Sequence, residues 1–247
     1  MKKKIIILTI IFVLLAYFGY KGFNLFYYNI DNITIQNYDS FKDRLNTKKT
    51  ITINNKKLNE SDYLISNNIK IRNDFKNYIF DDSYNVDKFV KYNLYDENNK
   101  VKSSFWFGIE DSYVSLLKSN SLVLFGDDSK VKNVNYKKIL EKNNVVNDID
   151  LINFLANNSD RKNNIFTPVK KMRENYSIQY LNSIITPIIT DFILINGDYQ
   201  GYILKLQANI KQVTILKDNK RYSFVFYGSE FDDENYIIDL ISTIIID

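Results

Sequence analysis

The sequence predicts an α+β protein, in which an N-terminal transmembrane helix is followed by an exported domain of antiparallel β-hairpins packed by helices. Three patterns predict this class. An uncharged apolar run follows three lysines at the N-terminus, apolar residues recur at helical spacing in the middle of the chain, and alternating strands separated by turns fill its last third. The 247 residues are 45% hydrophobic and 25% charged, which is the balance of a folded chain.

Residues 5–28 are expected to form a transmembrane signal-anchor. The run from Ile5 to Tyr20 carries no charge, and as a helix it spans about 24 Å, which approaches the roughly 30 Å hydrocarbon core. Lysines at positions 2, 3 and 4 predict that residues 1–4 are cytoplasmic and residues 29–247 extracytoplasmic. Aromatic side chains suited to the headgroup level form a belt at Tyr17, Tyr20, Phe23, Phe26, Tyr27 and Tyr28.

Three alternatives to a single-pass anchor are disfavoured. A cleaved signal peptide needs small residues at the cut, but every suitable frame around Ala16 to Gly19 contains a large aromatic residue. A lipoprotein needs a cysteine, and the chain has none. A helix that packs on the core of a soluble domain turns a polar face toward solvent, and this run has no polar face. The cell membrane is therefore the expected location.

The net charge of +4 belongs to the anchor. Residues 1–21 hold four lysines and no acid, so residues 22–247 carry 29 basic and 29 acidic side chains. Nucleic-acid binding normally requires a basic face that replaces phosphate counterions. The neutral exported part therefore predicts no nucleic-acid partner.

Strands are expected first and helices afterwards along the exported part. Thr50 to Ile53 alternates polar and apolar residues and precedes Asn54 and Asn55, as a strand entering a hairpin would. Residues 89–95 and 101–109 predict a second hairpin. Residues 134–142 and 148–157 predict short helices, and a third helix is expected to begin with Thr167 as N-cap and Pro168 at its first position. Its apolar face is expected to contain Val169, Met172, Tyr176 and Tyr180.

The last third predicts an antiparallel meander and a closing helix. Its expected strands are residues 192–195, 202–206, 213–216 and 222–227, with turns at 196–198 and 218–219. Ser229 and Asp232 resemble a capping box before a helix whose expected buried residues are Tyr236, Ile237, Leu240, Ile241 and Ile244. The apolar stretch 184–195 contains Pro187 and Asp191, so it predicts a helix end and a buried strand instead of a second membrane span.

Two segments share a pattern that allows a duplicated α+β unit. Residues 96–108 and 218–228 each combine a turn, an aromatic strand and a glycine, and an apolar helical pattern follows in both cases. Duplication would place a subdivision near residue 130. The match is short, so chance similarity is the competing explanation.

The chain contains no Cys and no His, which excludes thiolate and imidazole chemistry. Residues 81–87 place oxygen ligands at alternate positions, as a calcium loop does, but Val86 replaces the required glycine. A turn is the favoured interpretation. The acids at 232–234 are expected in a first helical turn, and Gly197 and Gly201 indicate a hairpin turn. We therefore predict no catalytic residue, no metal ligand and no cofactor-binding residue.

Two further segments could bind a ligand. The basic residues between 161 and 173 could in principle meet phosphate groups or an acidic partner, but a solvated helix face is the favoured interpretation of Lys170, Lys171 and Arg173. Trp106 and its aromatic neighbours could form a ligand platform or a buried strand.

The expected function is that of a membrane-anchored extracytoplasmic binding module. Its expected partners are the lipid bilayer, through the N-terminal helix, and a protein at the cell surface. One alternative is an immunity or accessory protein that acts on a secreted toxin or a membrane complex. Another is a cell-surface hydrolase that uses carboxylates or Ser and Lys; two carboxylates facing one cleft would favour it.

Overall fold

The computed structural model describes residues 2–28, 49–66, 68–82, 89–119, 134–158, 162–185, 189–206 and 209–247. The α+β class is confirmed. The chain forms two compact units, each built from separate stretches of sequence. Unit 1 contains residues 1–38, 117–146 and 150–187, and unit 2 contains residues 39–116, 147–149 and 188–247. The predicted subdivision near residue 130 lies outside the described residues.

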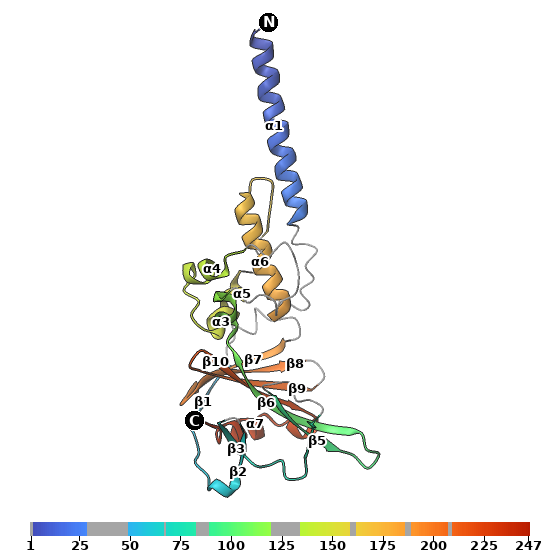
Figure 1. Ribbon diagram of the computed structural model, residues 1–247, viewed down its shortest axis with the longest axis vertical. Coiled ribbons are helices and arrows are strands. Elements are labelled where there is room, and N and C mark those ends of the chain that lie inside the picture. Colours follow the sequence, from blue (N-terminus) through green and yellow to red (C-terminus); the bar gives the residue numbers. More distant parts are fainter. Residues whose placement is uncertain are drawn as a thin grey trace. The chain divides into compact units, whose positions relative to one another are not determined.

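Helices form the regular structure that is described in unit 1 (Figure 1). The predicted helices at 134–142 and 148–157 are confirmed, and so is the helix near residue 168. Among the described residues, one helix, over Thr9–Tyr27, is long and apolar enough to cross a membrane. The helices of unit 1 are α1 (Lys2–Tyr27), α4 (Tyr136–Lys142), α5 (Asp148–Asn157, from residue 150 onward) and α6 (Val169–Ile185).

The predicted capping role of Thr167 is wrong. The first helical bond of α6 runs from the Met172 N–H to the Pro168 carbonyl, at 2.9 Å. The Thr167 hydroxyl instead accepts from the Asn164 N–H at 3.0 Å, in the turn before the helix. Asn164 competes for this hydroxyl because Asn and Thr side chains readily bond to nearby backbone groups.

Unit 2 is built on an eight-stranded sheet with the order β1-β7-β8-β9-β10-β6-β5-β4, accompanied by a three-stranded sheet with the order β11-β3-β2 (Figure 1). The large sheet contains β1 (Lys49–Ile53), β4 (Ile79–Phe80), β5 (Phe89–Tyr95), β6 (Val101–Asp111), β7 (Ile189–Gly197), β8 (Gln200–Leu206), β9 (Ile210–Lys217) and β10 (Lys220–Tyr227). The small sheet contains β2 (Tyr63–Ser66), β3 (Ile69–Arg72) and β11 (Ile245–Ile246). Short helices are η2 (Glu60–Asp62), α3 (Tyr113–Lys118, whose last two residues belong to unit 1), η5 (Ser229–Phe231) and α7 (Glu234–Ile241).

The antiparallel meander is confirmed. Strands β7, β8, β9 and β10 pair in sequence order, and β5 pairs with β6 as the predicted hairpin. Asp218 and Asn219 both have positive φ, 52° and 60°, as a two-residue hairpin turn with the favoured twist requires. Since α6 ends at Ile185 and β7 begins at Ile189, the stretch 184–195 is a helix end followed by a strand, as predicted.

The predicted hairpin after Ile53 is wrong, although its strand exists. Strand β1 pairs in parallel with β7, from Lys49 opposite Ile193 to Ile53 opposite Gly197. The chain after β1 turns away, because the Asp198 carboxylate accepts the Asn55 N–H at 2.7 Å. The pairing puts Ile53 in the core beside Ile193 and Ile195.

One face of the large sheet is covered by α7 and the small sheet (Figure 1). The core contains alternate residues of β6 and β10 together with Ile237, Leu240 and Ile241 of α7. The predicted capping box at Ser229 is wrong. Ser229 begins η5, and the N-cap of α7 is Asp233, whose carboxylate accepts the Asn235 N–H at 2.9 Å. The acid is a better cap at this position because it also faces the positive end of the helix dipole.

The two segments with a shared pattern are neighbours in one sheet. In the antiparallel pair of β6 and β10, Phe107 lies opposite Phe224, and Phe105 lies opposite Phe226. Both aromatic strands therefore line the same core of unit 2. Duplication stays a hypothesis.

Candidate functional site

The C-terminal end of α1 packs on α6 inside unit 1. Tyr28 is buried with Met172 and Tyr176, and its ring meets the Tyr176 ring edge-on at 6.0 Å between centroids. The Arg173 Nε donates to the Tyr28 hydroxyl at 3.0 Å, and the Asn163 amide donates to the Tyr28 carbonyl at 3.1 Å. This end of the apolar helix is thus an integral part of the fold of unit 1.

Lys21 of α1 contacts the chain just before the start of α6. It ends the uncharged run, and it is only 4% exposed. Its ammonium group donates to the carbonyl of Thr167, two residues before α6. Because Lys21 meets the start of α6 and Tyr28 meets residues one to two turns further on, the two helices run in the same direction here.

A cavity of about 460 Å³ lies between α4 and α6 of unit 1. Its volume is within the range of small-molecule sites. Apolar side chains from both helices contribute to its wall, among them Ile139 and Ile178. The polar lining residues are Asn135, Lys138, Lys142, Asn143, Lys170, Lys171, Arg173 and Glu174.

The lining of this cavity is strongly basic. Five of the described lining residues are Lys or Arg, and Glu174 is the one acid among them. Glu174 pairs with Lys171 at 3.3 Å, and the Nε of Arg173 donates to the Tyr28 hydroxyl. Lys138, Lys142 and Lys170 are exposed. Lysines arranged in this way can hold an anionic group such as phosphate or carboxylate as point charges.

The sequence indicated only half of this site. Lys170, Lys171 and Arg173 lie in the basic segment between residues 161 and 173. Lys170 is exposed, as the predicted solvated helix face requires. The structure adds Lys138 and Lys142 from α4, about thirty residues earlier in the chain. Their spacing of four residues on one helix is the sequence signal for this face.

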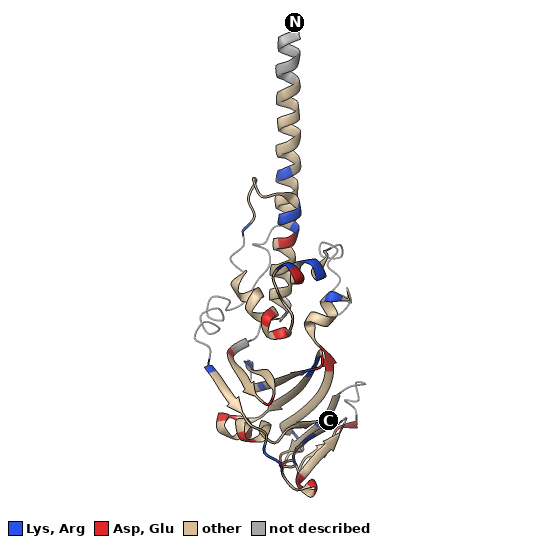
Figure 2. Ribbon diagram, turned by 90° about the vertical axis from the view of Figure 1, so that its left-hand side faces the viewer, with Lys and Arg blue, Asp and Glu red and all other residues tan. Residues whose placement is uncertain are grey.

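Charge is divided unequally between the two units. Figure 2 marks the described Lys and Arg residues in blue and the described Asp and Glu residues in red. Past residue 21, unit 1 carries eleven basic and seven acidic side chains, whereas unit 2 carries 18 basic and 22 acidic ones. The neutral total of residues 22–247 therefore conceals an excess of four positive charges in unit 1. That excess lies in the unit that holds the end of the apolar helix.

The other candidate segments of the sequence lie in unit 2, where their described side chains form contacts that stabilise the fold. Asp81 contacts Lys91 at 3.4 Å and accepts from Asn93 at 2.8 Å, while residues 83–87 of the calcium-like segment lie outside the described residues. Glu234 binds Lys49 and Lys205, which lower the pKa of its carboxyl. Trp106 lies on β6, with the Lys91 ammonium 6.0 Å from its ring.

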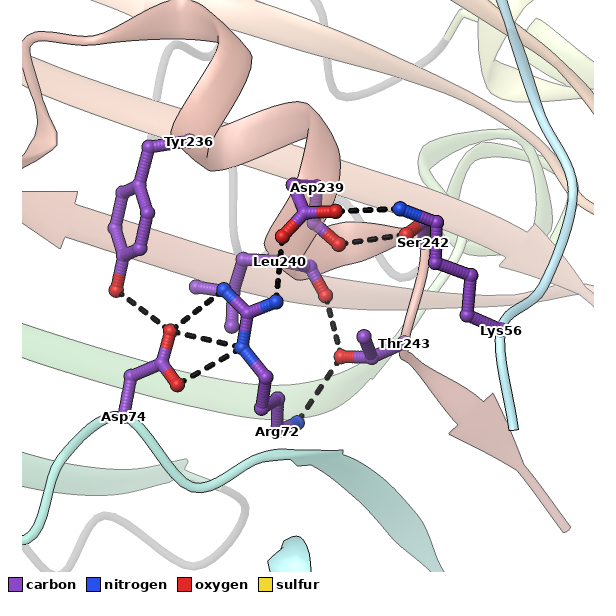
Figure 3. A network of polar contacts seen from close by, with 8 residues as sticks. All are labelled: Lys56, Arg72, Asp74, Tyr236, Asp239, Leu240, Ser242 and Thr243. Atoms are coloured by element: carbon purple, nitrogen blue, oxygen red, sulfur yellow. Dashed lines mark hydrogen bonds and ion pairs between the residues drawn. The ribbon is translucent and has the colours of Figure 1, made fainter. Parts of the chain in front are cut away.

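Two carboxylates share the Arg72 guanidinium in a network between β3 and α7 (Figure 3). The guanidinium donates to Asp74 at 2.8 Å and to Asp239 at 2.5 Å. Lys56 also donates to Asp239 at 2.5 Å, and the Tyr236 hydroxyl donates to Asp74 at 3.0 Å. The cations hold the pKa of Asp239 below its usual range, whereas an acid catalyst needs a raised one. The network joins the small sheet to α7.

A second arrangement places a serine beside a carboxylate. Ser103 and Tyr78 both donate to Glu230, and the two hydroxyls lie 2.8 Å apart. Burial raises the pKa of Tyr78. Ser103 is fully buried next to Gly228, so a substrate cannot reach its hydroxyl and the group is structural.

Buried charges also join the beginning of α5 to α3 within unit 2. The Asp148 carboxylate accepts the N–H groups of Tyr113 and Val114 at 3.1 and 3.0 Å. Arg221 binds Glu110 at 2.7 Å and lies 3.7 Å from the centre of the Tyr113 ring. Burial raises the pKa of Asp148. These contacts cap α3 and fix it to the sheet.

Replacing Asp239 with Asn is expected to remove a pH-dependent part of the stability of unit 2. Arg72 and Lys56 lower the pKa of this carboxyl, so its stabilisation is present above the ordinary pKa near 4 and is lost as the pH falls through the lowered pKa. Because Asp239 is 42% exposed, the loss at pH 7 should be only about 1 kcal/mol. Urea unfolding at steps from pH 7 to pH 2.5 measures it.

The difference between Asp239→Asn and the wild type should therefore shrink toward zero in acid. Asp218→Asn is the matched control, since Asp218 is exposed in a hairpin turn, and it should keep the wild-type profile. A difference that is constant over the whole pH range would show that the ion pair with Arg72 does not supply the effect.

Among the residues that the structure describes, no group of three or more Asp or Glu could hold a metal ion. No protein-family model matches the chain, and no curated protein matches its sequence.

Proposed function

We propose that this chain is a single-pass membrane protein whose exported part binds an anionic partner at the extracytoplasmic surface of the membrane. The observation that carries the proposal is the burial of Lys21, Asn24 and Tyr28 where α1 packs on α6. A cut near Ala16 to Gly19 would leave these contacts in the chain, so the retention of the anchor rests on the large aromatic residues at that place in the sequence. The contacts give a retained anchor a fixed attachment to the folded unit. The basic cavity beside this attachment supports binding as the activity.

The retained anchor is tested by fractionating cells that express the protein. We expect the full-length chain in the membrane fraction and its digestion by protease added to protoplasts. Phe18→Ala supplies a matched control, because it puts a second small residue two positions after Ala16, the spacing that signal peptidase requires at a cleavage site. This variant should release a shorter species into the medium. The same shorter species from the wild type would contradict the proposal.

The orientation can be tested with single cysteines, because the chain contains none. Lys57→Cys in unit 2 should react with a membrane-impermeant maleimide on intact cells, since Lys57 is exposed. Lys3→Cys should react only after lysis, because the N-terminal lysines favour the cytoplasmic side. The opposite labelling pattern would overturn the proposed topology.

A further inference from the structure

We propose that the basic cavity of unit 1 binds the phosphate of an anionic phospholipid in the membrane that α1 crosses. This inference rests on the proposed function and names the partner class of that site. It follows from the depth of the cavity relative to the membrane, the exposed aromatic residues at the same level, and the charge of the lining.

The cavity lies at the depth of the lipid headgroups. Lys21 marks the end of the uncharged run and contacts Thr167. Lys170 and Arg173 follow Thr167 by three and six residues, so at 1.5 Å per residue both lie within roughly 10 Å of it along the helix axis. The polar layer of a bilayer is about 5 to 8 Å thick on each side. A phosphate in this layer is within reach of the lysine side chains.

Exposed aromatic side chains mark the same level. Phe166, immediately before Thr167, is 81% exposed, and Phe23 and Phe26 are exposed on α1. Large apolar side chains are unfavourable in water, but aromatic residues are enriched where a membrane meets water. Phe166 therefore indicates that the turn before α6 touches the bilayer.

The charge of the cavity selects an anionic lipid. Five cations against one acid line it, and Lys and Arg side chains within a Debye length of anionic lipid headgroups are attracted to them. Its apolar lining residues Ile139 and Ile178 can contact the glycerol and acyl part of the same molecule. The excess positive charge belongs to unit 1, whereas unit 2 has an excess of acids.

The test uses the full chain in nanodiscs of equal parts phosphatidylcholine and phosphatidylglycerol, followed by native mass spectrometry of the lipids that the protein retains. The wild type should retain phosphatidylglycerol with about tenfold preference, given the attraction of several lysines. The variant with Lys138→Gln, Lys142→Gln and Lys170→Gln should retain both lipids nearly equally. Arg173 is left intact because it supports Tyr28.

A second set of variants separates the cavity from total charge. Lys57→Gln, Lys76→Gln and Lys100→Gln change the net charge equally at exposed positions of unit 2, and this variant should keep the preference. Lys138→Arg, Lys142→Arg and Lys170→Arg should keep it as well. Equal loss of preference in the unit 1 and unit 2 glutamine variants, or no preference in the wild type, would overturn the proposal.

Adding millimolar inorganic phosphate distinguishes a lipid from a free phosphate. The lipid assignment predicts that phosphatidylglycerol stays bound, because its acyl chains hold it in place. Displacement by phosphate would assign the cavity to a soluble phosphate and overturn the lipid assignment. The reconstituted chain contains α1 in every case, so retained lipid preference together with cleavage in cells would refute only the retained anchor.

The contact of Phe166 with the bilayer is tested by a spin label at Phe166→Cys. The label should collide more with oxygen, which dissolves in the hydrocarbon, than with a water-soluble nickel complex. A label at Lys76→Cys, exposed in unit 2, should show the reverse. The same preference for the nickel complex at both positions would place the turn in water and contradict the proposed depth.

Discussion

Replacing Phe105 with Ala is expected to lower the free energy of unfolding of unit 2 by about 3 to 5 kcal/mol. Phe105 is fully buried in β6. Its ring stacks on Phe75 at 4.1 Å between centroids and lies 5.1 Å from Phe226 and 5.3 Å from Phe107. These partners come from one loop and two strands, so a cavity at this position weakens contacts across the whole core.

The adjacent Trp106 provides the measurement, because it is the only tryptophan of the chain and lies on the same strand. Urea unfolding of the full chain in detergent, followed by Trp106 fluorescence, reports the stability of unit 2. Val101→Ala is the matched control, since Val101 begins the same strand but is exposed; it should cost less than about 0.5 kcal/mol. Similar effects of the two substitutions would show that Phe105 is not central to the core.

The helices and hairpins could be predicted because their signals are local. The turn Asp218 and Asn219 lies between two alternating strands, and the structure has both residues at positive φ, as the hairpin requires. The apolar spacing from Val169 to Tyr180 likewise predicted the face of α6 that packs on α1. In each case a pattern of fewer than about fifteen residues contains the information.

The parallel pairing of β1 with β7 could not be predicted in the same way. Strand β1 joins a partner about 140 residues later in the chain, and the Asn55 N–H donates to Asp198 just after the paired residues. Asn54 and Asn55 carry an ordinary turn signal that is equally compatible with a hairpin. Local patterns identified the strand but contain no information about which strand it joins.

The basic cavity could be predicted only in part, because a charge total over residues 22–247 does not show how the charges divide between the two units. The neutral total of residues 22–247 was a correct sum that concealed opposite excesses in the two units. The units interleave along the sequence, so no window of the chain corresponds to unit 1. Only the fold brings Lys138 and Lys142 beside Lys170.

Gly197→Ala should destabilise the edge of the large sheet by at least about 2 kcal/mol. Gly197 has a φ of 122°, a conformation that L side chains rarely adopt, and a Cβ added there would lie 2.0 Å from the carbonyl oxygen of Ile53. That oxygen belongs to β1, which pairs with β7 at this position. Relief of the clash requires the end of β1 to move away from β7, because both contacting groups are backbone.

Hydrogen exchange distinguishes this local effect from general unfolding. In Gly197→Ala, the amides of β1 should exchange faster than in the wild type, whereas those in the centre of β9 and β10 should change less, because these strands keep both neighbours. Gly22→Ala is the control: a Cβ at Gly22 has nothing within 4 Å, and alanine favours the helix. Unchanged exchange in β1 of Gly197→Ala would mean that the parallel pairing does not hold Gly197 against Ile53.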